Sequence, residues 1–326
     1  MTWFALPLLL VTATPPAPEP ADAQWVYIGT YTNAQSRGIY RVEFDAKSGR
    51  LGMPEVAAEL KNPSFLAIHP RRGFLYAVNE VSQVGGKPVG SVSGFVVDAK
   101  SGDLTPINRQ SSGGPGPCHL TVDSEGKAVL VANYGGGSVE SLPIGDDGKL
   151  GESATFIQHA GSSVDPGRQG EPHAHSINLD VTGRFAVAAD LGLDKVFVYR
   201  FDPTKATLAP NTPPFATVAA GSGPRHFAFH PSNKYGYVIN ELKSTVTAFR
   251  FDADLGTLNE LQTISTLPAD DKGKSYTAAE HRVRMRTTNG LERLNKEIKR
   301  RTRVATLFPQ HRQLPAPGHR HPGRTR

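Results

Sequence analysis

The stretch Gly223-Pro-Arg-His-Phe-Ala-Phe-His230 decides the fold, because its pattern also stands at earlier places in the 326-residue chain. The copies are Asn62-Pro-Ser-Phe-Leu-Ala-Ile-His69, Gly116-Pro-Cys-His-Leu-Thr-Val-Asp123 and the shorter Ser176-Ile-Asn-Leu-Asp180. Their last residues follow one another at intervals of 54, 57 and 50 residues. A period of this length predicts a chain built from repeated structural units.

Each unit has the pattern of a small antiparallel sheet. Ten residues after each of these last residues, an apolar run closes with an amide or a carboxylate: Asn79, Asn133, Asp190 and Asn240. A third strand ending in Phe-Asp or a similar turn follows, and the fourth comes after Gly-x-Leu. We therefore predict an all-β chain, a β-propeller of four-stranded blades. An earlier unit, 25–45, begins at its second strand, so about five blades are present. The other end of the chain would have to supply the missing strand.

Composition and charge agree with this prediction once residues 1–280 and 281–326 are considered separately. The 33 glycines and 26 prolines suit short strands joined by tight turns. The net charge of +6 resides in residues 281–326, which carry 13 − 2 = +11, so residues 1–280 carry 23 − 28 = −5. We therefore predict no specific nucleic-acid partner for the body. The single cysteine, Cys118, excludes an internal disulfide.

Residues 1–23 have the pattern of a signal peptide. An apolar run over 3–13 is followed by prolines and by Ala21-Asp22-Ala23, a small-residue cleavage signal. The pattern predicts a periplasmic or secreted protein. No Lys or Arg precedes the run, so a cytoplasmic protein with a misassigned start is the alternative. The run is too short to span a bilayer, and no other segment qualifies, so we predict no membrane span.

Residues 25 to about 280 resemble the lactonase-type propellers. The resemblance is carried by motifs that occur in order, among them Tyr27-Ile-Gly-Thr-Tyr-Thr32, Pro172-His-Ala-His175 and Gly223-Pro-Arg-His-Phe227. This family, which includes 6-phosphogluconolactonase and carboxymuconate cycloisomerase, has seven blades. The resemblance implies that 24–280 is a truncated propeller lacking about two blades. Because an open ring exposes strand edges, we expect weak folding, aggregation and impaired activity.

The basic tail, 281–326, differs in kind from the repeats. Residues 281–309 resemble the C-terminal segment of mutator-type transposases, but the two catalytic aspartates that this family would need are absent. Leu291, Leu294 and Ile298 fall on one helical face and Pro309 ends the pattern, which predicts a short helix. The residues after 310 are predicted to be disordered. We interpret the tail as an unrelated segment fused to the propeller.

Candidate site residues follow from the expected convergence of inner strands on a central channel. His119 and His226 occupy one column of the repeat, where Phe65 and Ser176 stand in the other blades. His173 and His175, two residues apart, would point to one side of an extended strand. Arg225 could hold an oxyanion or an anionic group with two hydrogen bonds. We therefore predict His119, His173, His175, Arg225 and His226 as catalytic, although the repeat does not fix which face each occupies.

The resemblance implies hydrolysis of a sugar lactone such as 6-phosphogluconolactone, with histidine as the base that activates water. Glu80, Asn133 and Glu241, at second-strand ends, are predicted to bind substrate; strand-end capping is the alternative for Asn133. His69 and His230 are interpreted as turn residues. We predict no cofactor, no metal, a small-molecule lactone as the partner, and a monomer. The alternatives are a lactonizing muconate cycloisomerase and a non-catalytic binding propeller.

Overall fold

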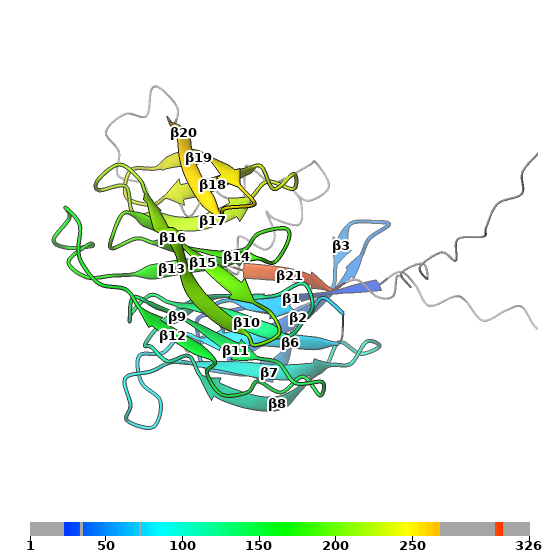
Figure 1. The fold of residues 1–326 in the computed structure, drawn as a ribbon. Coiled ribbons are helices and arrows are strands. Elements are labelled where there is room, and N and C mark those ends of the chain that lie inside the picture. Colours follow the sequence, from blue (N-terminus) through cyan, green and yellow to red (C-terminus); the bar gives the residue numbers. More distant parts are fainter. Residues whose placement is uncertain (1–22, 33–34, 72, 268–303, 309–326) are drawn as a thin grey trace, which may run out of the picture.

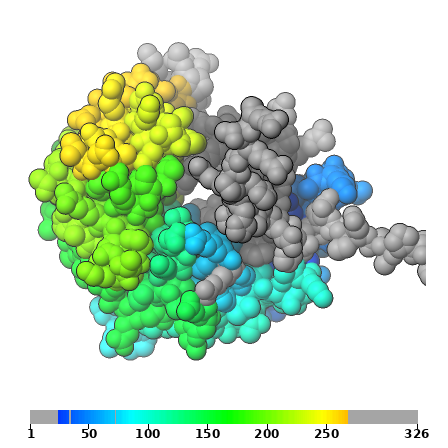
Figure 2. Space-filling model, turned by 45° about the vertical axis from the view of Figure 1, so that its right-hand side comes forward, coloured from blue at the N-terminus to red at the C-terminus, as the bar shows by residue number. Residues whose placement is uncertain are grey.

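The computed structural model describes residues 23–32, 35–71, 73–267 and 304–308, and these form strands without a helix. The strands make five antiparallel sheets, which follow one another along an arc (Figure 1). Figure 2 shows the same order, with the yellow fifth sheet at one end of the arc. The predicted all-β propeller of four-stranded blades is confirmed.

Blades two to five are each four consecutive strands, with the first strand of the blade innermost. The second blade holds β5 (Leu66–Ile68), β6 (Phe74–Asn79), β7 (Ser91–Val97) and β8 (Leu104–Ser111). The third holds β9 (Pro117–Val122), β10 (Ala128–Asn133), β11 (Ser138–Pro143) and β12 (Thr155–Gln158). The fourth holds β13 (Ala174–Leu179), β14 (Phe185–Asp190), β15 (Lys195–Asp202) and β16 (Thr207–Thr217). The fifth holds β17 (Pro224–Phe229), β18 (Tyr235–Asn240), β19 (Thr245–Asp252) and β20 (Thr257–Ser265).

The first blade is completed from the far end of the chain. It contains β1 (Ala23–Gly29), β2 (Gly38–Asp45), β3 (Arg50–Leu51) and β4 (Glu55–Glu59), and β3 and β4 both pair with β2. The inner position is taken by β21 (Val304–Phe308), which pairs antiparallel with β1, from Trp25 opposite Phe308 to Gly29 opposite Val304. β21 also contacts β5, the inner strand of the next blade.

This pairing corrects one expectation from the sequence and confirms another. Residues 304–308 lie in the tail for which the sequence predicts a helix, yet they form a strand, because the open edge of β1 offers backbone partners. The sequence also predicts that the other end of the chain supplies the missing strand of this blade, and β21 confirms it, so the first blade lacks the unpaired inner edge expected of an open ring. The proposed signal peptide and the helical pattern over 285–303 lie outside the described residues.

The turns between first and second strands confirm the equivalence of His69 and His230 with aspartates. In Asp123 the carboxylate accepts hydrogen bonds from the backbone N–H groups of Glu125, Lys127 and Ala128. In the sister turns, Nδ1 of His69 accepts from the N–H of Arg71 at 3.0 Å and Nδ1 of His230 from that of Ser232 at 3.1 Å. Both histidines therefore act as turn residues.

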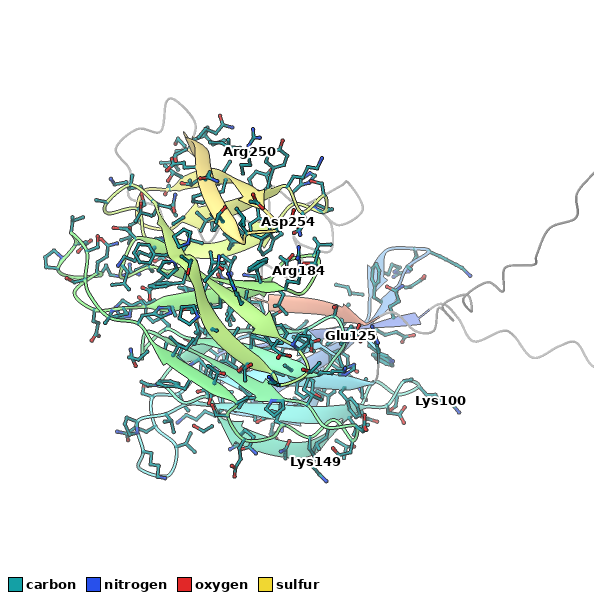
Figure 3. The ribbon with its side chains drawn as sticks, viewed as in Figure 1. Lys100, Glu125, Lys149, Arg184, Arg250 and Asp254 are labelled. Atoms are coloured by element: carbon teal, nitrogen blue, oxygen red, sulfur yellow. The ribbon has the colours of Figure 1, made fainter. Side chains whose placement is uncertain are left out.

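The hydrophobic core is divided into layers between neighbouring blades. One cluster joins the third and fourth blades and contains Leu130 of β10 and Ala188 of β14. Another joins the fourth and fifth blades and contains Val187 of β14 and Phe249 of β19. Charged side chains lie around the outside, as Figure 3 shows for Lys100, Glu125, Lys149, Arg184 and Asp254 at or beside turns and for Arg250 in β19. Each blade is thus held chiefly by the next one.

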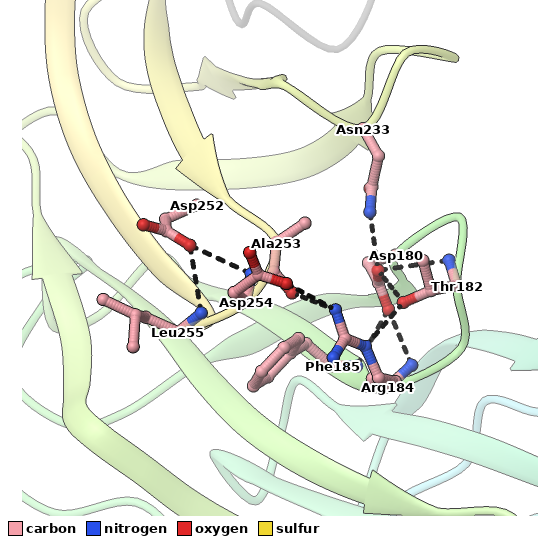
Figure 4. A network of polar contacts seen from close by, with 9 residues as sticks. All are labelled: Asp180, Thr182, Arg184, Phe185, Asn233, Asp252, Ala253, Asp254 and Leu255. Atoms are coloured by element: carbon pink, nitrogen blue, oxygen red, sulfur yellow. Dashed lines mark hydrogen bonds and ion pairs between the residues drawn. The ribbon is translucent and has the colours of Figure 1, made fainter.

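Polar contacts add to this packing at the rim. Asp180, in the first turn of the fourth blade, accepts a hydrogen bond from Asn233 of the fifth at 2.8 Å. Arg184 donates to the carbonyl of Ala253 at 2.5 Å and pairs with Asp254 at 3.4 Å (Figure 4). The rim pairs are exposed and contribute little to stability, but they show that turns of one blade dock on turns of its neighbour.

Candidate active site

Three of the four predicted histidines meet where the inner strands converge. β9, β13 and β17 contact one another in order. The ring of His226 lies 5.4 Å from that of His119 and 5.2 Å from that of His175, measured between centroids. Phe65, from the second blade, packs on His119 at 4.1 Å. We call His119, His175 and His226 the hub histidines.

His119 also has a structural task. It is buried, and its Nδ1 accepts a hydrogen bond from the backbone N–H of Ile177 in the next inner strand, at 3.3 Å. Ser176, its equivalent in the fourth blade, accepts from the N–H of Phe227 in the same way, also at 3.3 Å. The repeat position shared by His119 and Ser176 therefore links successive inner strands. Because Nδ1 of His119 accepts this hydrogen bond, the proton of the neutral ring is on Nε2.

Burial and a neighbouring arginine set the protonation state of His175. Its side chain is buried, and burial lowers its pKa well below the usual 6.5; the positive charge of Arg225 lowers this pKa further. His175 is consequently neutral at physiological pH and can accept a proton. The Cys118 thiol lies 3.8 Å from its Nδ1, and burial raises the pKa of that thiol, so Cys118 stays protonated.

His173 lies at the edge of the group rather than within it. Its ring stacks on Tyr134, with centroids 4.5 Å apart, and its Nδ1 hydrogen-bonds to the Tyr134 carbonyl at 2.9 Å. Because that carbonyl is only an acceptor, Nδ1 carries the proton. Tyr134 also contacts His175, with ring centroids 5.2 Å apart. The i, i+2 spacing thus brings only His175 into the cluster of rings.

Two arginines share one buried carboxylate beside the hub histidines. Glu241 accepts from Arg225 through Oε2 and from Arg168 through Oε1, the latter at 2.8 Å. Glu241 is buried, and Nε of Arg225 is buried without a hydrogen-bond partner among the described residues. Within this group two guanidinium groups face one carboxylate, and this excess positive charge favours an anionic ligand. The charge of Glu80, which acts on the neighbouring Cys118, offsets part of it. The repeat pattern did not predict Arg168, because its loop, 159–173, has no counterpart in the other blades.

The two remaining predicted binding residues differ in position. Glu80 hydrogen-bonds to the Tyr31 hydroxyl at 2.6 Å and to the Ser64 hydroxyl, so it is held by the first two blades. Asn133 is fully buried, and its amide donates to the Ser112 carbonyl at 2.7 Å and to the Ser138 hydroxyl at 3.1 Å. These contacts are those of a strand-end cap, the alternative interpretation of Asn133, and set it apart from the hub histidines.

A buried relay that sequence reasoning missed supports the His173 segment. His159 hydrogen-bonds through Nδ1 to Asp190 and through Nε2 to the Tyr199 hydroxyl, both at 2.6 Å. The other oxygen of Asp190 accepts the backbone N–H of His173 at 2.8 Å. The relay borders a cavity of about 210 Å³ lined by Phe197, Phe215, Pro210 and Pro214 among others. Its hydrogen bond to His173 and the pairing of Asp190 with Ala174 in β13 connect it with the hub.

Two absences concern only the residues that the structure describes. No group of three or more His, Cys, Asp and Glu side chains among them is arranged to hold a metal ion. Nor does this part of the chain contain a helix long and apolar enough to cross a membrane.

Comparison with known proteins identifies the class of this propeller. Residues 25–286 match the family model described as lactonase, 7-bladed beta-propeller. The chain is 36% identical to the 6-phosphogluconolactonase of Bacillus subtilis (strain 168), over 78% of this chain and 70% of that protein. It is 33% identical to the 6-phosphogluconolactonase of Formosa agariphila, over 69% and 63%.

Solved structures agree with this class. A putative 6-phosphogluconolactonase from Bacteroides fragilis has a TM-score of 0.71 at 36% identity, covering 78% of this chain and 70% of its own. The Pseudomonas aeruginosa periplasmic gluconolactonase also has a TM-score of 0.71, at 34% identity, with coverages of 77% and 70%. The fold and these matches define a lactonase-type propeller.

The chain belongs to the lactonase family of seven-bladed β-propellers. Five blades lie within the described residues, and the chain spans 70% and 63% of the lengths of the two curated relatives. Residues 273–314 match a second model, described as transposase, Mutator family, so the resemblance found in the tail is confirmed.

Proposed function

We propose that the hub histidines and the Arg225–Glu241–Arg168 group hydrolyse a sugar lactone, with 6-phosphogluconolactone as the phosphorylated candidate. The observation that carries this proposal is a buried imidazole close to two guanidinium groups that share one carboxylate: the positive charges of Arg225 and Arg168 both lower the pKa of His175. The names of the relatives, 6-phosphogluconolactonase and gluconolactonase, support the same reaction.

The chemistry requires a base and a stabiliser of negative charge. A water molecule attacks the lactone carbonyl carbon while the neutral His175 imidazole accepts one of its protons. The carbonyl oxygen becomes an oxyanion, which Arg225 stabilises. The C–O bond of the ring then breaks, and the leaving alkoxide takes the proton from the imidazolium. The product is a hydroxy acid, which ionises and releases one proton to solvent.

The excess positive charge determines which lactones bind well. Glu241 neutralises one of the two guanidinium groups, so a phosphate or carboxylate on the substrate supplies the remaining negative charge. A neutral lactone such as glucono-δ-lactone lacks this contact and is the natural comparison substrate.

Proton release from 6-phosphogluconolactone and from glucono-δ-lactone tests the proposal, after subtraction of spontaneous hydrolysis. We expect His175→Ala and Arg225→Ala to lower kcat/KM at least about 100-fold, the usual contribution of a general base or an oxyanion donor. His230→Asn removes an exposed turn histidine and is the matched control, expected to leave the rate unchanged. Equal rates for all three variants and the parent chain would remove the site assignment.

Export is a further part of the proposal. The apolar run over 3–13 and the Ala21-Asp22-Ala23 triplet support a cleaved signal peptide and a periplasmic or secreted location. The relative from Pseudomonas aeruginosa is described as periplasmic. Mass spectrometry of the chain from a periplasmic fraction is expected to give Gln24 as the first residue; an intact N-terminus in the cytoplasm would contradict export.

A further inference from the structure

One contact is repeated where successive blades meet. The hydroxyl of Tyr27 in β1 donates to the carbonyl of Gly102 in the second blade at 2.8 Å. The hydroxyl of Tyr76 in β6 donates to the carbonyl of Gly148 in the third blade at 2.9 Å. Both glycines belong to the turn between a third and a fourth strand. We call the residue at this place in the turn the knob of its blade.

An aromatic ring on the preceding blade forms the other half of this contact. The residue two positions before the tyrosine covers the knob: a Cβ on Gly102 would lie 2.5 Å from Trp25, and one on Gly148 would lie 2.7 Å from Phe74. The aromatic residue and the tyrosine together form the socket of a blade. The glycine knobs have no room for a side chain because the aromatic residue fills that space.

The fourth and fifth blades show that size is matched between knob and socket. A Cβ on Gly256, the knob of the fifth blade, would lie 2.3 Å from Phe185. In the third blade the equivalent socket residue is the small Ala128, and the knob of the fourth blade is Ala206, which packs in the same cluster. Where the socket residue is small, the knob carries a methyl group, so a glycine knob indicates an aromatic socket.

The first blade has a glycine knob without a socket. Gly49 lies in the turn between β2 and β3, at φ 68°, and its N–H is bonded to the Asp45 carbonyl at 2.8 Å. Gly102 and Gly256 have φ of 71° and 67° and the corresponding bonds to Asp98 and Asp252. No described atom lies within 4 Å of the place that a Cβ on Gly49 would occupy. The part of the chain that the structure describes therefore leaves the knob of the first blade uncovered.

The fifth blade has a socket without a knob. Tyr237 stands three residues before the strand-end Asn240, as Tyr76 stands before Asn79, and Tyr235 stands where Phe74 does. Tyr235 and Tyr237 are 37% and 38% exposed, whereas Tyr76 is fully buried. Among the described residues, the Tyr237 hydroxyl has no hydrogen-bond partner. Nearer the hub, Ile239 and Val246 are already buried, so only the outer part of this face is open.

We propose that these two ends bind each other between copies of the chain: the Gly49 knob of one copy docks on the Tyr235–Tyr237 socket of another. The occupant is a second copy because the other glycine knobs lie against aromatic sockets, and among the described residues neither open half meets its counterpart within one chain. The first and fifth blades, blue and yellow in Figure 2, lie at the two ends of the arc. The contact joins unlike surfaces, so it produces a head-to-tail assembly instead of the monomer expected from the sequence.

Two variants each remove one half of the contact. Gly49→Asn places a side chain where the socket needs empty space, yet asparagine tolerates the positive φ of the turn. Tyr237→Lys puts an unpaired charge into the interface. Each is expected to weaken self-association at least about 100-fold, because a buried charge or clash opposes docking. Gly85→Asn, at another open glycine with φ 58°, is the matched control for backbone strain.

Sedimentation velocity of the full chain across micromolar concentrations tests the proposal. We expect larger species as the concentration rises for the parent chain and for Gly85→Asn, and monomers for Gly49→Asn and Tyr237→Lys. A mixture of the two monomeric variants retains one intact knob and one intact socket, so it should form a heterodimer and nothing larger. A parent chain that stays monomeric, variants that associate like the parent, or a mixture without heterodimer would each overturn the proposal.

Discussion

A buried glutamate in the third blade makes the stability of this protein depend on pH. Glu140, in β11, is 2% exposed, and its Oε2 has no hydrogen-bond partner among the described residues. Burial raises its pKa from the ordinary 4.5 to about 7, although a hydrogen bond from Ser153 opposes this shift. Desolvation disfavours the ionised form, so the folded protein holds this proton more tightly than the unfolded chain does.

The sign and size of the effect follow from the two pKa values. Below pH 4.5 the carboxyl is protonated in both states and imposes no penalty. As the pH rises from there to about 7, the unfolded chain ionises first and the free energy of unfolding falls. Each unit of pKa shift corresponds to about 1.4 kcal/mol, so the whole loss is about 3 kcal/mol. Above the folded pKa the penalty is constant.

Glu140→Gln keeps the shape of the side chain and removes its charge. We expect the free energy of unfolding in urea, compared between about pH 5 and about pH 8, to fall by roughly 2 to 3 kcal/mol more in the parent chain than in this variant. Glu152→Gln, at an exposed position nearby, is the control and should behave like the parent. If Glu140→Gln loses as much stability as the parent between the two pH values, the reasoning about burial is refuted.

Three further predictions concern the site and the closure of the first blade. Because neutral His175 is the active form and its pKa lies well below 6.5, kcat/KM should fall with acid only below that pH; an acid limb centred at or above it would count against His175 as the base. Arg168→Gln should raise KM for 6-phosphogluconolactone about tenfold and leave KM for neutral glucono-δ-lactone within about twofold, since it removes one anion-binding guanidinium; equal effects on both would exclude this role. Thr306→Pro should speed hydrogen exchange of the β1 amides at least about tenfold, because β21 pairs with β1 there, and unchanged exchange would exclude the pairing.

The arrangement of the strands could be predicted because it depends on local pattern. Apolar runs set the strands, and the recurring amides and carboxylates at their ends identify the blades. The equivalence of His69 with Asp123 followed from position in the repeat, and both were found accepting backbone hydrogen bonds in the same turn. These hydrogen bonds join residues only a few positions apart in the chain, so the local sequence is enough to predict them.

The candidate site could be predicted only in part. Its histidines and Arg225 could be named, because inner strands of a propeller converge. The orientation of each ring could not, because it depends on strand twist and on the neighbouring blade: His175 turns toward His226, whereas His173 turns to the Tyr134 carbonyl. The Asn133 amide donates to the Ser112 carbonyl and caps its strand. Arg168 carries no repeat signal at all, and only the fold brings its loop to Glu241.

The sequence by itself therefore determined the blade repeat, the turn chemistry and the residue types available at the hub, since each follows from interactions between near neighbours in the chain. Only the tertiary structure decided which of those residues meet, that residues 304–308 complete the first blade, and that Gly49 and Tyr237 do not meet a counterpart of the repeated contact within the described part of the chain. The physical reason is that packing between blades joins residues tens to hundreds of positions apart, and that geometry exists only once the sheets are arranged around a common axis.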